Sequence, residues 1–459
     1  MVNQYNETLE KYLDIVCKQI KSKCMHKKIR KELLDHLNDQ IDAYIEKGIT
    51  KEQASVMATK EMGNPLEIGN QLNNTHKPLI SHSTIIIILM FIAVSGIIQY
   101  LFSYSLFAID MGLSNSPLIN FIKYSVTGIL SFIAVYFFDY TWLKKHPITC
   151  YMIFIILITI INVTTSESMG GKYLAIYPFL LFVPVYASVV YSLRNTKLIG
   201  IIVSIIAFIP AIIISKIISF DYPYIIVLFS CLALLTCAIL KGYFNCNKII
   251  KISTIIIISI IFLVVICNLF TKVITLTKEI EEIDGKGFET YVIKESIVNA
   301  KPFGETMINY DSSLQPIDSM VDNWSRYKTL IYINSKYGYV PALVITTLLL
   351  SLVYKLIRIH KKQQNHFGTL LSLGCVSVIS LQIIISIFYN IGLNICRISP
   401  FPLISYGADN FIVNMILLGL ILSIYRRSNI IDDKLYNDGS YIYYKNGKLI
   451  FDLKYYKNL

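Results

Sequence analysis

The segment "PFPLISYGADNFIVNMILLGLILSIYRR", from Pro400 to Arg427, decides the fold of this chain. It opens with two prolines and a Ser-Tyr-Gly turn, continues as an apolar run of membrane-span length, and ends in two arginines. The prolines and Gly407 predict irregular backbone immediately before the helix. Irregular backbone at membrane depth persists only where it is buried in protein or lines a wet cavity, so this entrance must do one or the other.

The composition of the chain agrees with a membrane protein. Of its 459 residues 54% are hydrophobic, and the mean hydropathy is +0.56, which is too apolar for an ordinary soluble domain. The net charge of +12 comes largely from lysines and arginines beside apolar runs, where they act as topology signals, so we expect no nucleic-acid partner. The nine cysteines occur singly, which argues against a disulfide framework and against a metal site.

From Ser83 onward the chain contains about ten apolar segments of span length. They lie near residues 84–105, 118–138, 148–165, 173–193, 198–218, 223–241, 253–273, 338–358, 367–391 and 409–426. Basic residues follow the even-numbered spans, as Lys144 and Lys145 follow the second and Arg426 and Arg427 the tenth. The sequence therefore predicts an all-α polytopic protein of the plasma membrane, with both termini in the cytoplasm.

Three further regions flank or interrupt the spans. The connection 274–337 is expected outside the cell, and its aromatic and branched residues predict an ordered, amphipathic segment rather than a disordered loop. Residues 428–459 alternate aromatic and polar residues around "NDGS" and "KNGK", which predicts a small cytoplasmic β-hairpin. Residues 1–78 have amphipathic periodicity for three short helices, with Thr50 and Gln53 spaced for a capping box.

Region 1–78 resembles the permease-prefix (HAAS-type) domain that precedes many bacterial membrane proteins. That domain has a pattern "E-x-x-x-H-x-x-D" followed by glycine, alanines and a final "M-G-x-P". The matching residues here are Glu32, His36, Asp39, Gly48, Ala54, Ala58, Met62, Gly63 and Pro65. The resemblance implies a small cytoplasmic helical bundle for protein contacts or regulation.

The entrance and the last span resemble the C-terminal signature of the SEDS family (FtsW, RodA, SpoVE). In that family "P-F-I-S-Y-G-G-S" precedes the last span and "G-x-x-L-S-I-x-R-R" closes it. The matching residues are Pro402, Leu403, Ile404, Ser405, Tyr406, Gly407, Gly419, Leu422, Ser423, Ile424, Arg426 and Arg427. "NIGLNI" at 390–395, "KPFGET" at 301–306 and the large outer loop also match, so the resemblance implies a SEDS-type membrane domain over 83–427.

SEDS proteins polymerise lipid II outside the membrane, usually with a class B penicillin-binding partner. The resemblance therefore implies a role in peptidoglycan synthesis during division, shape maintenance or sporulation, with lipid II or another undecaprenyl-linked precursor as ligand. The chemistry needs a base for the acceptor hydroxyl and cations for the diphosphate leaving group. The candidate bases are Asp322 and Asp318, and the candidate substrate-binding residues are Lys172, Arg397, Lys301, Pro402, Ser405, Tyr406, Gly407 and Asp409.

The sequence also departs from the family where charge is expected. Counting back eleven residues from Gly338 to the family's catalytic carboxylate gives Tyr327, and the family's Glu and Lys of the fourth span correspond to Leu180 and Val183. Each candidate has a structural alternative: Asp409 as a helix-dipole partner, Asp322 as a solvated acid, and the lysines as interfacial anchors.

Two other functions therefore stay open beside glycosyl transfer. One is a non-catalytic SEDS homologue that binds a lipid-linked precursor or a division or sporulation protein, and the other is a transporter of such precursors. The sequence indicates no cofactor and is compatible with a divalent cation.

Overall fold

The computed structural model describes two compact units of the chain. It describes residues 2–21, 23–75, 77–103, 116–165, 176–218, 221–278, 286–310, 313–316, 328–393, 396, 399–430, 442–445 and 448–451. The first unit comprises Met1–Ile80 with Arg426–Asp432, and the second Ser81–Tyr425 with Asp433–Leu459. We call them the N-terminal unit and the membrane unit and treat each by itself.

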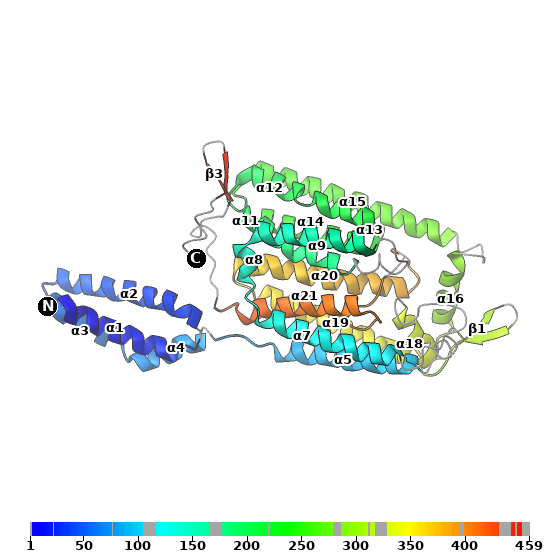
Figure 1. Cartoon of the computed structure of the whole chain (residues 1–459), viewed down its shortest axis with the longest axis horizontal. Coiled ribbons are helices and arrows are strands. Elements are labelled where there is room, and N and C mark those ends of the chain that lie inside the picture. The colour runs from blue at the N-terminus through cyan, green and yellow to red at the C-terminus, as the bar shows by residue number, and fades with distance from the viewer. Residues whose placement is uncertain are drawn as a thin grey trace. The chain divides into compact units, whose positions relative to one another are not determined.

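The N-terminal unit contains four helices where the sequence predicted three (Figure 1). They are α1 (Val2–Gln19), α2 (Lys23–Glu46), α3 (Lys51–Met62) and α4 (Pro65–Thr75). Gly63, with φ of 93°, ends α3, and Pro65 starts the extra helix at once, because proline suits the first helical position. Thr50 takes the N-cap position of α3 without a side-chain hydrogen bond, so the expected capping box does not form.

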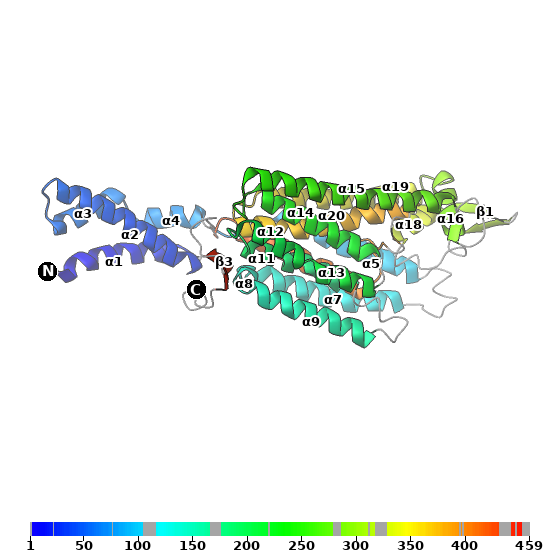
Figure 2. The same cartoon turned by 90° about the horizontal axis from the view of Figure 1, so that it is seen from above.

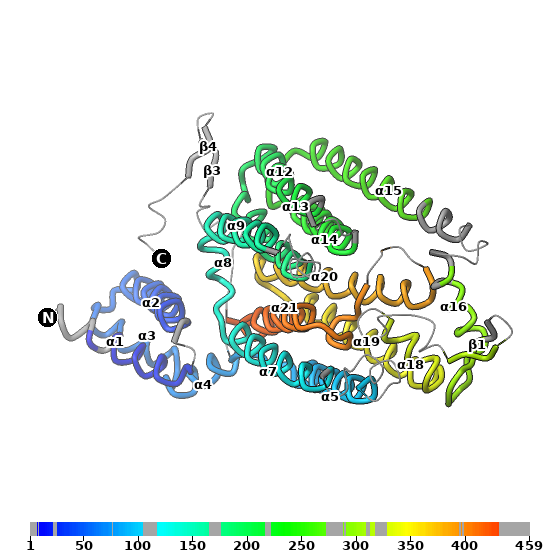
Figure 3. Tube along the Cα trace, turned by 45° about the vertical axis from the view of Figure 1, so that its right-hand side comes forward, coloured from blue at the N-terminus to red at the C-terminus, as the bar shows by residue number. Residues whose placement is uncertain are grey.

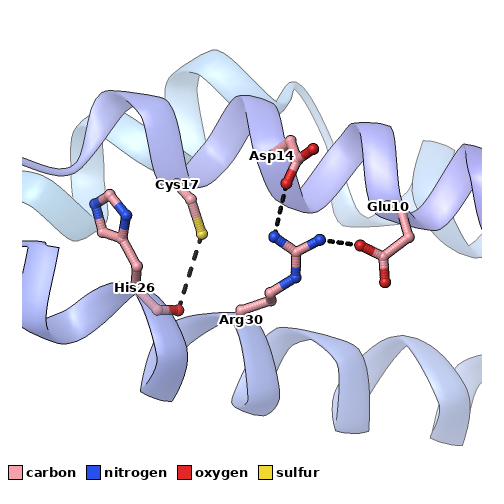
Figure 4. A network of polar contacts seen from close by, with 5 residues as sticks. All are labelled: Glu10, Asp14, Cys17, His26 and Arg30. Atoms are coloured by element: carbon pink, nitrogen blue, oxygen red, sulfur yellow. Dashed lines mark hydrogen bonds and ion pairs between the residues drawn. The ribbon is translucent and has the colours of Figure 1, made fainter.

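The core of the N-terminal unit is aliphatic. Leu13 and Val16 of α1 and Leu37 of α2 are fully buried in one cluster, and Ile430, which follows the last span, packs into the same cluster. On the exposed side, the Arg30 guanidinium of α2 bridges the carboxylates of Glu10 and Asp14 on α1 (Figure 4). The N-terminal unit therefore includes a short segment from the far end of the chain.

The membrane unit confirms the all-α polytopic fold. Within the described residues, nine helices are long and apolar enough to cross a membrane. Eight are α5 (His82–Ser103), α7 (Ser116–Phe137), α9 (Pro147–Thr165), α14 (Asp221–Leu240), α15 (Lys248–Lys278), α19 (Tyr339–Lys361), α20 (His366–Asn390) and α21 (Ala408–Arg426). The ninth consists of α12 (Lys197–Ile206) and α13 (Ile209–Ile218), which are interrupted just before Pro210.

The predicted span at 173–193 is shorter in the described residues. A 3-10 turn, η1 (Pro178–Leu181), leads into α11 (Phe182–Ser192), and residues 166–175 lie outside the described part of the chain. This segment packs against α9, α14 and α20. Its side chains Phe179, Leu180, Phe182 and Val183 are fully buried, so it is an interior element.

Helices α20 and α21 form the centre of the membrane unit. Figures 1 and 3 show them between a layer that contains α12 to α15 and a layer that contains α5 and α7. In their most apolar windows 67% and 72% of the residues are buried, against 0% for α15. The entrance to α21 is thus surrounded by other elements, whereas α15 lies at the periphery.

Shorter elements complete the membrane unit. The five-residue α8 (Thr141–Lys145) joins α7 to α9. Helices α16 (Lys286–Val298) and α18 (Thr329–Tyr337) gather with the antiparallel pair β1 (Met307–Tyr310) and β2 (Ser313–Pro316) at one end of the bundle (Figure 2). Near the C-terminus β3 (Ile442–Lys445) pairs antiparallel with β4 (Lys448–Phe451).

Candidate functional site

The entrance turn, which we define as residues 399–407 between α20 and α21, has unusual backbone geometry. Leu403 adopts a φ of +68° although its side chain is buried, and Gly407 adopts +150°. A non-glycine residue at positive φ is uncommon and persists only where the surroundings impose it. At Gly407 a Cβ atom would also lie 3.2 Å from Asp409 Oδ1, so glycine fits both the conformation and the space.

Ser405 closes the turn from within. Its Oγ accepts a hydrogen bond from the Phe401 backbone N–H at 2.9 Å and lies 3.2 Å from the Thr329 hydroxyl at the start of α18. Both hydroxyl side chains are buried. The turn is therefore tied to the first residue of α18 through Ser405.

Helices α5 and α7 hold the other side of the turn. Ser95 Oγ and Gln99 Nε2 of α5 both donate to the Ile404 carbonyl, at 3.2 and 3.4 Å. On α7, Asn120 Nδ2 donates to the Tyr406 hydroxyl at 3.1 Å. The Ile404 carbonyl and the Tyr406 side chain are thus anchored by side chains that the sequence places in ordinary apolar spans.

The start of the turn is anchored by α14 and α20. Ser386 Oγ of α20 and the Tyr222 hydroxyl of α14 donate to the Pro400 carbonyl, at 2.8 and 3.4 Å. One turn further along α20, Asn390 Oδ1 accepts the backbone N–H groups of Leu330 and Ile331, both at 3.1 Å. Asn390 thereby satisfies free donors in the first turn of α18, as a capping residue does.

A chain of side-chain amides, the amide ladder, connects the turn to the bundle centre. It consists of Asn410, Asn414 and Gln382. Asn410 Nδ2 donates to the Phe401 carbonyl at 3.0 Å, and Asn414 Nδ2 donates to Asn410 Oδ1 at 2.7 Å. Asn414 and Gln382 exchange two hydrogen bonds of 3.1 Å, and all three residues are buried.

The backbone carbonyls of residues 400, 401 and 404 thus accept hydrogen bonds from uncharged hydroxyl and amide side chains of the protein. What the entrance presents outward is Tyr406, Ala408 and Asp409, which keep exposed surface, and Asp409 also lies in the first turn of α21 where the helix dipole favours a carboxylate. A ligand at this site would meet the stretch from Tyr406 to Asp409.

The structure brings some of the predicted site residues together and leaves others outside its description. Pro402, Ser405, Tyr406, Gly407 and Asp409 share the entrance. The predicted bases Asp318 and Asp322 and the predicted cations Lys172 and Arg397 lie outside the described residues.

Lys301 is described and exposed. Its Nζ donates to the Glu305 carbonyl at 3.1 Å, and its own carbonyl accepts the Tyr339 N–H at 2.9 Å. Lys301 therefore belongs to the segment between α16 and β1 rather than to the entrance turn. No group of three or more metal-binding side chains occurs among the residues that the structure describes.

Several residues of the site were missed from the sequence. The missed polar residues recur every four positions, as Ser95 and Gln99 do on α5, Ser386 and Asn390 on α20, and Asn410 and Asn414 on α21. Such spacing puts both members of each pair on one helix face, and it could have predicted these polar faces from the sequence.

Comparison with known proteins identifies relatives of the membrane unit. The sequence profile of the FtsW/RodA/SpoVE family, described as cell cycle proteins, matches residues 82–430. The probable peptidoglycan glycosyltransferase FtsW of Geobacter metallireducens is 28% identical over 98 residues, which are 21% of this chain and 26% of that protein. The match thus spans about a quarter of the length of this curated relative.

Solved structures match this chain at low identity, and one of them with a TM-score above 0.5. A chain from a structure described as "Structural coordination of polymerization and crosslinking by a peptidoglycan synthase complex" covers 78% of this chain and 99% of its own length, with 14% identity and a TM-score of 0.53. The rod shape determining protein RodA of Thermus thermophilus covers 77% of this chain and 98% of its own length, with 12% identity and a TM-score of 0.49.

Proposed function

The chain belongs to the FtsW/RodA/SpoVE family of cell cycle proteins, and from this premise we propose that it binds lipid II or a similar undecaprenyl-linked precursor and polymerises its glycan. The observation that supports a site at the entrance is its bracing. Side chains from α5, α7, α14, α18 and α20 fix an irregular turn between two central helices, and Tyr406, Ala408 and Asp409 keep exposed surface. Irregular backbone inside a bundle persists only where it is buried in protein or lines a wet cavity, and the exposed surface of Tyr406, Ala408 and Asp409 favours a cavity at this end of the turn.

In this proposal the roles follow the chemistry of glycosyl transfer. A carboxylate, Asp322 or Asp318, removes the proton from the acceptor hydroxyl as that oxygen bonds to the donor's anomeric carbon and the bond from this carbon to the diphosphate breaks. Lys172 and Arg397 neutralise that leaving group, and Lys301 contributes positive charge further out. The entrance turn forms one wall of the proposed substrate site. It orients the lipid-linked substrate and does not act as an acid or a base.

The proposal includes orientation and partner. Lys144 and Lys145 after α7 and Arg426 and Arg427 after α21 favour the cytoplasm for those ends, which puts the entrance turn on the outer side and both termini inside. A class B penicillin-binding protein, or another division or sporulation protein, is the proposed partner, because glycan strands require cross-linking.

One observation favours a second candidate, a precursor-binding protein without catalysis. Leu180 and Val183, which the resemblance places where the family carries Glu and Lys, are fully buried beside Phe179 and Phe182. An apolar, close-packed interior at these positions leaves no room for the missing charges.

Purified full-length protein incubated with fluorescent lipid II, with and without a class B penicillin-binding protein, separates the two candidates. Glycan polymer that is lost in either Asp322→Ala or Asp318→Ala, but not in both, identifies the base and supports polymerisation. Saturable lipid II binding without polymer under either condition supports the second candidate. A protein that neither binds lipid II nor forms polymer would contradict both candidates.

A further inference from the structure

Helix α3 of the N-terminal unit buries one side and exposes the other. The buried side consists of the small residues Ala54, Ser55 and Ala58. The exposed side lines a shallow groove in which Val56 and Met57 are the apolar members of the helix, and they are 56% and 42% exposed. Adjacent apolar side chains that are left exposed on a polar helix are typical of an interaction surface.

Two charges of opposite sign flank Val56 on the exposed side. Glu52 lies about one turn before Val56 and Lys60 about one turn after it, and both side chains are exposed. Residues four positions apart share a helix face, so these three residues form one row. The helix dipole favours an acid in the first turn and a base in the last turn, but it does not account for the apolar residues between them.

This row is complementary to a second copy of itself. When two α3 helices pack antiparallel about a two-fold axis at Val56, each Glu52 faces Lys60 of the second copy, because both lie four residues from the axis. The contact then contains two identical ion pairs around the two Val56 side chains, as an interface between identical patches requires. Moving the axis to residue 55 or 57 would remove both ion pairs.

We propose that the N-terminal unit pairs with that of a second copy of this chain through α3, with Val56 on the two-fold axis. The self-complementary row of charges favours a second copy over an unrelated protein. The contact uses one face of a 12-residue helix, which is small beside the roughly 1,200–2,000 Å² that a stable interface buries. The pair should therefore be weak in dilute solution and form where the membrane holds two chains at a high local concentration.

Energy transfer between full-length chains that carry donor or acceptor fluorophores on C-terminal tags, reconstituted together in phosphatidylcholine vesicles, tests the proposal. Val56→Glu brings two like charges together at the axis and is expected to weaken association about tenfold or more. Leu66→Glu is the matched control, because Leu66 is an apolar residue of α4 that is 48% exposed and does not line the groove. We expect Leu66→Glu to associate as the wild type does.

Charge reversal tests the antiparallel arrangement without changing its apolar centre. Glu52→Lys and Lys60→Glu each replace two ion pairs with two like-charge contacts, so each variant should associate with itself about threefold or more weakly than the wild type. A pair made of one Glu52→Lys chain and one Lys60→Glu chain contains both ion pairs again. Energy transfer in the mixture of these two variants should therefore recover to the wild-type level.

Three results would each overturn the proposal. They are wild-type transfer no higher than that of chains distributed at random in the membrane, unchanged transfer in Val56→Glu, and no recovery in the mixture of the two charge-reversed variants. Because association is measured without substrate, its outcome does not depend on the proposed function.

Discussion

Gln382 on α20 and Asn414 on α21 hold one another by two amide hydrogen bonds of 3.1 Å, with both side chains fully buried. Asn414 passes this connection through Asn410 to the Phe401 carbonyl in the entrance turn. The geometry of the turn is therefore coupled to the packing of the two central helices. A substitution that alters the packing of α20 against α21 should therefore alter the backbone conformation of the turn.

We predict that Asn414→Leu destabilises the membrane unit by about 1–3 kcal/mol, because it leaves the Gln382 amide buried without its partner. Gln382→Leu together with Asn414→Leu should cost less than the sum of the two single changes, because the double variant removes both halves of the pair. The midpoint of SDS-induced unfolding, followed by circular dichroism, measures these losses. Strictly additive losses would show that the pair is not coupled.

The sequence predicted the membrane fold well because span length and flanking charge are strong signals. It also predicted the irregular entrance turn, because Pro402 and Gly407 have strong local backbone preferences. It did not predict the side chains that brace the turn, because Ser95, Asn120 and Tyr222 reach it from distant parts of the chain. Tertiary proximity of that kind is not encoded in local periodicity, although the four-residue spacing of polar groups gave a hint.

Gly338, between α18 and α19, combines two constraints. Its φ is +98°, and a Cβ atom would lie 2.4 Å from the Pro302 carbonyl oxygen. Gly304 has a similar φ of +94° with open space around it. We predict that Gly304→Ala costs about 1–2 kcal/mol from backbone strain alone, and that Gly338→Ala costs clearly more, as measured by the same unfolding midpoint. Equal destabilisation by the two substitutions would mean that the backbone at 301–303 moves aside without a cost in free energy.

Cys17 of α1 should react slowly with alkylating agents. Burial raises the pKa of the Cys17 thiol, and the nearby Asp14 carboxylate raises it further. The thiolate is the reactive form, so its fraction at neutral pH is smaller than that of an ordinary thiol, and the alkylation rate should still be rising at a pH where an ordinary cysteine has reached its plateau. Mass spectrometry of the Cys17 peptide after timed iodoacetamide treatment of the native protein gives this profile. A plateau at or below the usual thiol range would contradict the assignment.

Ile430 should stabilise the N-terminal unit although it follows the last span. Its side chain is buried in the same cluster as Leu13 and Leu37. Ile430→Asp places a carboxylate in that cluster and should make residues 1–80 markedly more sensitive to limited proteolysis. Ile430→Val, at about 0.5–1.5 kcal/mol, should have only a small effect. Unchanged protease resistance of the Asp variant would show that the cluster is complete without Ile430.

The central claim is that Tyr406, Ala408 and Asp409, which keep exposed surface, line an external site for a lipid-linked precursor. Ala408→Cys tests it most directly, because Ala408 is exposed. We predict that a membrane-impermeant maleimide labels this variant in intact cells above the wild-type background, and that added lipid II slows the labelling of the purified protein. Labelling only from the cytoplasmic side of inverted vesicles, or a rate unaffected by saturating lipid II, would contradict the account.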